Sequence, residues 1–261
     1  ASQVGTVGHP SNQALSATSG TFTTDLTVDT STLKVDSTNN RVGVGTGGPS
    51  RTFQVDSADN RVAKVHHTDG DYSFIVFEDD NTSDDGQVRV GAYGNDLQLF
   101  AGGSARILAD STGAVTMPSQ PAFSVHKNAT DQNNLATTDT TITWTHERFD
   151  NNADFDLDNN RFVAPVTGKY FLQVNIRLEN IDTAAAYIQV NLETSNLIYR
   201  FILDPDYFDS DSVYYSMGFP VLADMDASDT AFISFTQSGG TAQTDIDGNP
   251  NYTWFSGNLV C

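Results

Sequence analysis

Acidic side chains are the groups in this sequence with the clearest capacity for chemistry, because carboxylates bind cations and transfer protons. Asp204, Asp206, Asp209 and Asp211 fall within eight residues around Pro205, in a segment that we expect to be a loop. Oxygen-rich loops of this kind suit Ca²⁺, which takes about six to eight oxygen ligands. The segment therefore predicts either a calcium site or a solvated acidic loop.

A second group of aspartates has a spacing that imitates the start of a helix-loop-helix calcium site. Asp154, Asp156 and Asp158 alternate as that loop requires, but Asn159 stands where glycine is needed and Pro165 where the bidentate glutamate belongs. We expect no specific metal site there. The acidic run at residues 78–86 is expected to be an exposed turn.

The spacing of the histidines and the absence of hydrolase motifs both argue against catalysis. His66 and His67 are adjacent, so on a strand they point to opposite faces and can only form a ring around a symmetry axis. His9, His126 and His146 have no partner at a spacing typical of catalysis. The sequence contains neither a Gly-x-Ser-x-Gly elbow nor a His-Glu-x-x-His zinc motif. We therefore expect a protein that is not an enzyme and requires no cofactor.

Aromatic residues in the loop-rich C-terminal part are the better candidates for ligand binding. Tyrosine offers apolar area together with a hydroxyl group, which suits contacts with sugars or proteins. The alternative for such residues is packing in the core or at a subunit interface. The candidate ligand-binding residues are Tyr199, Tyr207, Phe208, Tyr214, Tyr215 and Tyr252.

Composition limits the range of partners. Thirty-three acidic residues against 13 basic ones give a formal charge of −20, which disfavours nucleic acid and anionic membrane surfaces. No apolar segment approaches the roughly 20 residues needed to cross a bilayer. Cys261 is the only cysteine, so no disulfide can form within one chain, and we expect a free thiol.

Alternation of apolar and polar residues predicts strands throughout the second half. This period of two is typical of strands with one buried face, and the loops between them are rich in Asp, Asn, Ser, Thr and Gly, as in a β-sandwich or jelly roll. Pro165 and Pro220 are expected at bends or sheet edges, where a missing amide hydrogen is tolerated. The predicted buried positions are Tyr170, Leu172, Val174, Ile176, Leu178, Ile188, Val190, Leu192, Ala231, Ile233 and Phe235.

A spaced set of residues in this half resembles the globular head of the complement C1q family. The set consists of Trp144, Asp150, Phe155, Phe162, Gly168 and Tyr170, and residues 121–125 and 252–257 resemble the family's opening and closing strands. Trp144 and Leu172 stand where the family usually has phenylalanine. The resemblance covers residues 121–261 and implies a ten-stranded jelly roll, a compact homotrimer, and ligand recognition without catalysis. It also implies calcium near the trimer axis in some members.

The first half contains an internal repeat. Residues 35–42 recur at 55–62 with six of eight positions identical, and Leu33 is matched by Phe53. Each copy predicts a strand, a polar turn and a second strand, and further short strands are expected at 87–91, 96–100 and 106–115. Units this small cannot bury their own apolar faces, so stability must come from stacked neighbours or from other chains.

The segment from Leu33 to Ser50 also resembles a run common in fibre and tail proteins of bacterial viruses. We expect a flexible anchoring arm at 1–25, a β-stranded trimeric stalk at 26–120 and a head at 121–261. The absence of a Gly-X-Y period excludes a collagen stalk. The predicted protein is a homotrimeric bacteriophage fibre or spike on the virion surface, attached to capsid or tail by its arm, whose head binds a host-surface glycan or protein. The alternatives are a secreted or cell-surface adhesin or lectin, and a capsid decoration protein.

Overall fold

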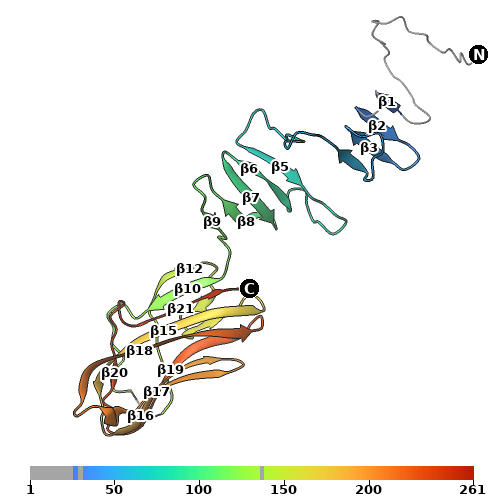
Figure 1. The fold of residues 1–261 in the computed structure, drawn as a ribbon. Helices are drawn as coiled ribbons and strands as arrows, with labels where there is room; N and C mark the ends of the chain where they lie inside the picture. Colours follow the sequence, from blue (N-terminus) through green and yellow to red (C-terminus); the bar gives the residue numbers. More distant parts are fainter. Residues whose placement is uncertain (1–25, 29–31, 136–137) are drawn as a thin grey trace, which may run out of the picture. The chain divides into compact units, whose positions relative to one another are not determined.

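The computed structural model describes residues 26–28, 32–135 and 138–261, which consist of strands, turns and loops (Figure 1). The chain forms two compact units, Ala1–Phe74 and Ile75–Cys261. Within the described residues, the single helical segment is a 3-10 turn, η1 (Pro205–Tyr207), and no helix is long and apolar enough to cross a membrane. The anchoring arm predicted at 1–25 lies outside the described residues.

The first unit contains a four-stranded sheet built on the first copy of the repeat. Its strands are β1 (Leu26–Val28), β2 (Leu33–Asp36), β3 (Arg41–Val44) and β4 (Phe53–Val55), in that order. The hairpin β2–β3 is antiparallel, as predicted. Its turn is stabilised by Asp36, whose Oδ1 accepts the backbone amides of Thr38 and Asn39 at 3.1 Å each, while the Asn39 amide group donates to Oδ2 at 2.9 Å.

The second copy of the repeat folds differently from the prediction. Its first strand, β4, pairs in parallel with β3, but residues 61–64, the counterpart of β3, form no strand in the described chain. One of the two positions that differ between the copies removes a hydrogen bond of the turn. Asn39 is replaced by Asp59, which cannot donate back to the turn aspartate, and Asp56 instead accepts the side chain of Gln54 at 2.8 Å. The closing turn is therefore lost.

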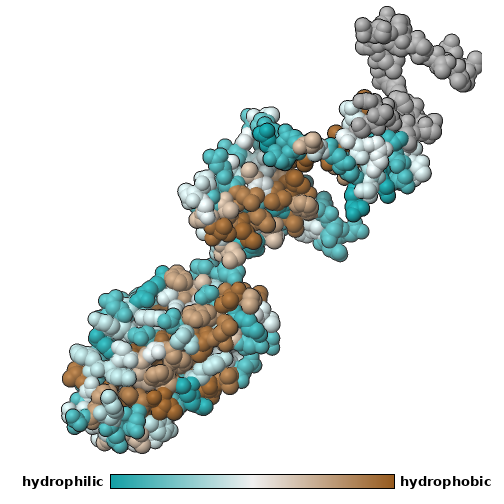
Figure 2. Space-filling view, viewed as in Figure 1, coloured by the Kyte–Doolittle hydropathy of each residue, from teal (hydrophilic) through white to brown (hydrophobic). Residues whose placement is uncertain are grey.

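Residues 72–116 form a five-stranded sheet, whose last four strands make an antiparallel meander. Its strands are β5 (Tyr72–Val76), β6 (Arg89–Tyr93), β7 (Asp96–Ala101), β8 (Ser104–Ala109) and β9 (Val115–Thr116), which confirms the short strands predicted there. Leu97, Leu99 and Ile107 remain exposed on one face of this sheet, where Leu99 lies opposite Ile107. Figure 2 shows hydrophobic residues gathered over the surface of this part of the chain.

Residues 121–261 form a jelly roll of two packed sheets, which confirms the predicted fold class. Each sheet has a continuous path of five strands with one short strand added. The first sheet is β12 (His146–Asp150), β10 (Ala122–His126), β21 (Trp254–Leu259), β15 (Gly168–Ile181) and β18 (Ser212–Met225), with β20 (Asp245–Ile246) on β15. The second is β13 (Phe155–Asp156), β14 (Arg161–Val163), β19 (Thr230–Gly239), β16 (Ala185–Thr194) and β17 (Ile198–Leu203), with β11 (Thr140–Thr141) on β19.

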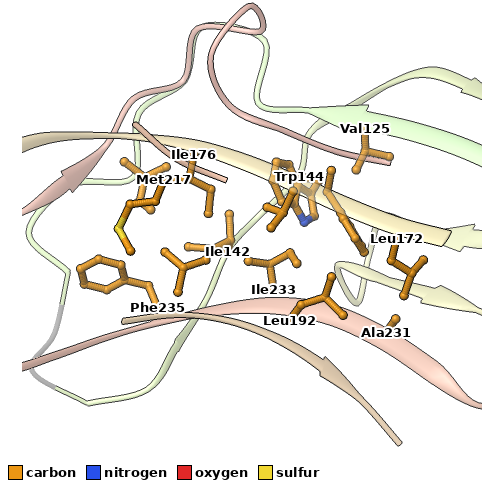
Figure 3. Close-up of a cluster of buried hydrophobic side chains, with 14 of the residues drawn as sticks. Val125, Ile142, Trp144, Leu172, Ile176, Leu192, Met217, Ala231, Ile233 and Phe235 are labelled. Atoms are coloured by element: carbon orange, nitrogen blue, oxygen red, sulfur yellow. The ribbon is translucent and has the colours of Figure 1, made fainter. Parts of the chain in front are cut away.

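The core lies between these two sheets, and every buried position predicted from alternation is buried. Figure 3 shows Ile176 and Met217 from the first sheet facing Ile233 and Phe235 from the second. At one end, the ring of Phe123 stacks on Phe162 at a centroid distance of 4.7 Å. Contacts of this kind add to the area that the rings remove from water.

The residues of the family-like set have identifiable structural roles. The carboxylate of Asp150 accepts the backbone amides of Asp154 and Phe155 at 3.0 and 2.8 Å, and the hydroxyl of Tyr170 donates to a backbone carbonyl at 2.7 Å. At Gly168 a Cβ atom would lie 2.7 Å from the carbonyl oxygen of Cys261, so a larger residue does not fit. Asp150 therefore fixes the loop before β13, whereas Phe155, Phe162 and Tyr170 are buried in the core.

Trp144 is a core residue, and the two prolines lie outside the centre of the sheets. Trp144 is 2% exposed, but its indole Nε1 has no hydrogen-bond acceptor among the described residues. Pro165 lies in the bend between β14 and β15, and Pro220 lies on β18, an edge strand, as predicted.

Candidate functional site

A polar hollow of about 340 Å³ lies where the ends of several strands of the first jelly-roll sheet come together. The register brings Ser212 at the start of β18 opposite Ile181 at the end of β15, and Asp245 of β20 opposite Glu179 of β15. The loop after β10 joins them through a bridge between Gln132 and Ile246. The lining residues are Asn134, Asn180, Asp211, Ser212, Val213, Gln243 and Asp245.

Two carboxylates fix the geometry of this hollow. Asp245 accepts the backbone amide of Asn134 at 2.6 Å through Oδ1 and the side-chain amide of Asn180 at 2.8 Å through Oδ2. Asn180 has a backbone φ of +52°, a left-handed conformation that asparagine tolerates better than most residues. These contacts hold one side of the hollow in a defined arrangement.

Asp211 performs the same role on the other side. Its Oδ1 accepts the amide and the hydroxyl of Thr183 at 3.1 and 2.6 Å, and its Oδ2 accepts the side-chain amide of Gln243 at 2.8 Å. The hydrogen bonds from Thr183 and Gln243 lower the pKa of Asp211 below its ordinary value. Asp211 therefore stays ionised into acidic solution.

Of the four aspartates predicted to hold calcium, only Asp211 lines the hollow. Asp204 caps η1 by accepting the backbone amide of Asp206 at 3.1 Å, and Asp209 is exposed. Across the described residues, no group of three or more His, Cys, Asp or Glu side chains is arranged to hold a metal. The cluster at 204–211 is thus not gathered into one ligand set within a chain, and calcium binding stays a prediction.

Two of the predicted aromatic residues flank a cation. The guanidinium of Arg177 lies 3.9 Å from the ring centre of Tyr252 and 4.6 Å from that of Tyr214. It also forms ion pairs with Asp247 and, at 3.6 Å, with Glu179. Partial burial and the neighbouring carboxylates raise the pKa of Glu179. The guanidinium of Arg177 is therefore already in contact with two carboxylates and two aromatic rings of its own chain.

The other predicted aromatics are divided between surface and core. Tyr207 is 87% exposed, whereas Tyr199, Phe208 and Tyr215 are half-buried and pack against the core. Phe208 lies edge-on to Tyr215 at a centroid distance of 5.5 Å. The six residues therefore do not converge on one site.

Three of the histidines contact other residues of the chain. His126 and His146, which the sequence did not connect, stack at a centroid distance of 5.8 Å across β10 and β12. His67 contacts the carbonyl of Tyr72 at 3.1 Å through Nδ1. Residues 78–86 form an exposed turn closed by Asp79, as predicted.

Sequence reasoning predicted Asp211 but missed the other six residues that line the hollow, namely Asn134, Asn180, Ser212, Val213, Gln243 and Asp245. They come from separate loops and strand ends. Single Asn, Gln and Asp residues in such segments have no spacing that marks a site. The positive φ of Asn134 and Asn180 becomes visible only with the fold.

Comparison with known proteins yields likeness at the level of structure. No protein-family model matches this sequence, and no curated protein matches it. Among solved structures, the globular domain of zebrafish complement 1qA protein is similar, with 17% identity and a TM-score of 0.40, over 54% of this chain and 98% of that one. Murine APRIL at pH 8.0 is similar with 12% identity and a TM-score of 0.40, over 54% and 99% of the respective chains. Both similarities cover about half of this chain and concern the fold alone.

Proposed function

We propose that this chain is a homotrimeric fibre or spike protein of a bacteriophage virion, attached to capsid or tail, with a jelly-roll head that binds a host-surface receptor or glycan and catalyses no reaction. The observation that carries the proposal is the lack of a core in the N-terminal part. Between residues 32 and 120, only Gly43 and Pro49 are buried. Sheets that bury so little apolar area gain little free energy to offset the conformational entropy lost on folding, so we expect other chains to stabilise them.

The apolar face of the β5–β9 sheet supports assembly from several chains. Leu97 and Leu99 on β7 lie beside Ile107 on β8, and all three are exposed in the single chain. Neighbouring apolar side chains exposed on one face of a sheet are typical of an interaction surface. Other copies of the same chain are the natural occupants, because each copy carries the same uncovered face.

The second copy of the repeat supports the same conclusion. Residues 61–64 share the Arg-Val pair that begins β3 but form no strand, and Val62 and Val65 are exposed. Backbone that is suited to a strand but unpaired adds readily to the sheet of another chain. In the proposed trimer, this segment pairs with a neighbouring copy.

The jelly roll offers two different apolar surfaces that suit a closed ring. On the outer face of the first sheet, Phe171 lies directly opposite Leu222, and both are exposed. At the open edge between the two sheets, Phe201 of β17 stacks on Phe219 of β18 at a centroid distance of 5.9 Å. Packing the edge of one copy on the face of the next is a head-to-tail contact, which closes into a ring when the rotation allows.

The trimer is tested by placing a charge on this face. Phe171→Asp buries an unpaired carboxylate in the proposed interface, so we expect dissociation to monomers at micromolar concentration by sedimentation. Tyr187→Asp is the matched control, because Tyr187 and Phe171 are both 38% exposed but Tyr187 lies on β16 of the other sheet. A trimer that tolerates Phe171→Asp, or loses its assembly through Tyr187→Asp, contradicts the proposed interface.

The virion role is tested by removing the head. Particles that carry a chain without residues 121–261 are expected to stay intact but to adsorb poorly to host cells. Fragile particles with normal adsorption would instead indicate a capsid decoration protein. A chain that is absent from purified particles and found on the bacterial surface would indicate an adhesin.

A further inference from the structure

We infer that the polar hollow between Asn134, Asn180, Asp211, Gln243 and Asp245 is a binding site for an uncharged, hydroxyl-rich saccharide. This inference rests on the proposed function, because it names the class of glycan that the head would recognise. The hollow's volume of about 340 Å³ lies at the lower end of the range for small-molecule sites, roughly 300–1,000 Å³. That size accommodates one or two sugar rings.

The hydrogen-bonding groups of the hollow fit hydroxyl groups. Asn180 and Gln243 each use one side-chain N–H on a carboxylate, Asp245 and Asp211 respectively. Each carboxamide has a second N–H and a carbonyl oxygen with two lone pairs, one of which accepts the hydroxyl of Thr241 at 3.0 Å in Gln243. Each carboxylate also has further lone pairs. A sugar hydroxyl both donates and accepts, so adjacent hydroxyls can bridge such an alternating set of groups.

The carboxamides are also held in place before a ligand arrives. Each of the two is anchored by a carboxylate that is itself fixed by backbone amides, that of Asn134 for Asp245 and that of Thr183 for Asp211. Groups fixed in this way lose little conformational entropy on binding. Pre-organisation matters most for a ligand such as a sugar, which gains only modest net energy from each hydrogen bond.

Charge decides between neutral and anionic sugars. Asp211 and Asp245 are both in the lining, and none of the described residues that line the hollow is basic. The nearby cation, Arg177, is already engaged by Asp247 and Glu179. A sialylated, sulfated or phosphorylated ligand would bring a further negative charge next to two carboxylates, without a cation to compensate it.

Val213 supplies the apolar contact that sugar binding also requires. It lines the hollow with its side chain 60% exposed, at the start of β18. The C–H face of a pyranose ring is apolar, so a small exposed aliphatic side chain beside hydrogen-bonding amides suits its two kinds of surface.

The experiment measures retention of the full chain on immobilised polysaccharides. The neutral probes are dextran, mannan, galactan and xylan. Dextran sulfate, which is the same polymer as dextran with sulfate groups added, is the anionic probe. We expect retention on at least one neutral polymer, elution by its free sugar, no preference for dextran sulfate, and no effect of EDTA. Asn180→Ala and Gln243→Ala should each weaken binding about tenfold, because each removes the hydrogen bonds of one carboxamide.

The control is Asn159→Ala, which removes a similar carboxamide–carboxylate pair, with Asp156, at the turn between β13 and β14. It should leave binding unchanged. Equal effects of the three variants, stronger retention on dextran sulfate, loss of binding in EDTA, or no retention on any neutral polymer would each overturn the inference. Sedimentation of the same samples separates this failure from that of the proposed function, since a trimer without sugar binding refutes only the site.

Discussion

The jelly roll and the N-terminal sheets are both built of β-strands, yet they differ in where their apolar residues find partners. In residues 121–261, two sheets pack face to face, and the 14-residue strands β15 and β18 contribute side chains to the core between them. In residues 32–120, strands of two to six residues form single sheets, and only Gly43 and Pro49 are buried. The head has its own core, whereas the N-terminal sheets have apolar faces without a core.

This difference shows that alternation predicts a buried face but not what covers it. Leu97 and Leu99 alternate with polar residues as clearly as Leu172 and Val174 do. The second pair is covered by another sheet of the same chain, and the first pair is exposed. Coverage within one chain requires a second sheet of similar length, and the N-terminal strands provide none.

The largest expected loss of stability comes from removing a buried aromatic ring from the core of the head. Phe255 is fully buried, with its ring 5.0 Å from Phe123 and 6.1 Å from Trp144 between centroids. Phe255→Ala should lower the free energy of unfolding of the head by about 3–5 kcal/mol, through lost burial and the cavity that remains. Denaturant unfolding followed by tryptophan fluorescence measures this change.

Phe53→Ala is the counterpart in the first unit, where Phe53 is 67% exposed in the single chain. It should leave the head transition within about 0.5 kcal/mol of its original value and weaken the N-terminal transition by an amount that depends on protein concentration. An N-terminal transition that is independent of concentration would show that this region is stable without other chains.

An intermediate effect is expected from a buried cation in the head. Lys127 is fully buried, and its Nζ donates to Gln132 and Thr143 at 2.9–3.2 Å. Burial lowers the pKa of Lys127 from 10.5 to about 8. Between these values the unfolded chain binds more protons than the folded one, so the stability contributed by this group rises with pH and is lost as pH falls through about 8.

Comparison with Lys127→Met isolates this contribution. Between pH 7 and pH 10, the wild-type free energy of unfolding should gain about 2 kcal/mol on that of the variant. Titrations in denaturant at the two pH values measure the gain. A difference between the two proteins that does not change with pH would mean that the Lys127 amine keeps its ordinary pKa in the folded head.

The smallest expected effect concerns Trp144. The buried indole N–H has no acceptor among the described residues, and an unsatisfied buried donor costs about 1–3 kcal/mol. Trp144→Phe removes that cost but also some buried area, so the free energy of unfolding should change by less than about 1 kcal/mol. A loss above about 2 kcal/mol in the same unfolding assay would indicate that the indole N–H is satisfied.

The head could be predicted in detail because its signals are local and mutually consistent. The alternation in β15, β16 and β19 predicts the buried side chains individually, and the prolines fall at a bend and an edge. The second copy of the repeat could not be predicted from similarity, because a copy with six of eight identical positions still lacks the Asn39 side-chain donor that contacts Asp36 in the first. The binding hollow could not be predicted either, because its residues meet only through the pairing of β15, β18 and β20.

Sedimentation equilibrium of the full chain at micromolar concentration tests the central claim, that several copies together cover the apolar faces that one chain leaves exposed. We expect a single species with three times the 28.2 kDa mass of one chain. A stable monomer of 28.2 kDa, with cooperative unfolding of its N-terminal sheets, would contradict the account.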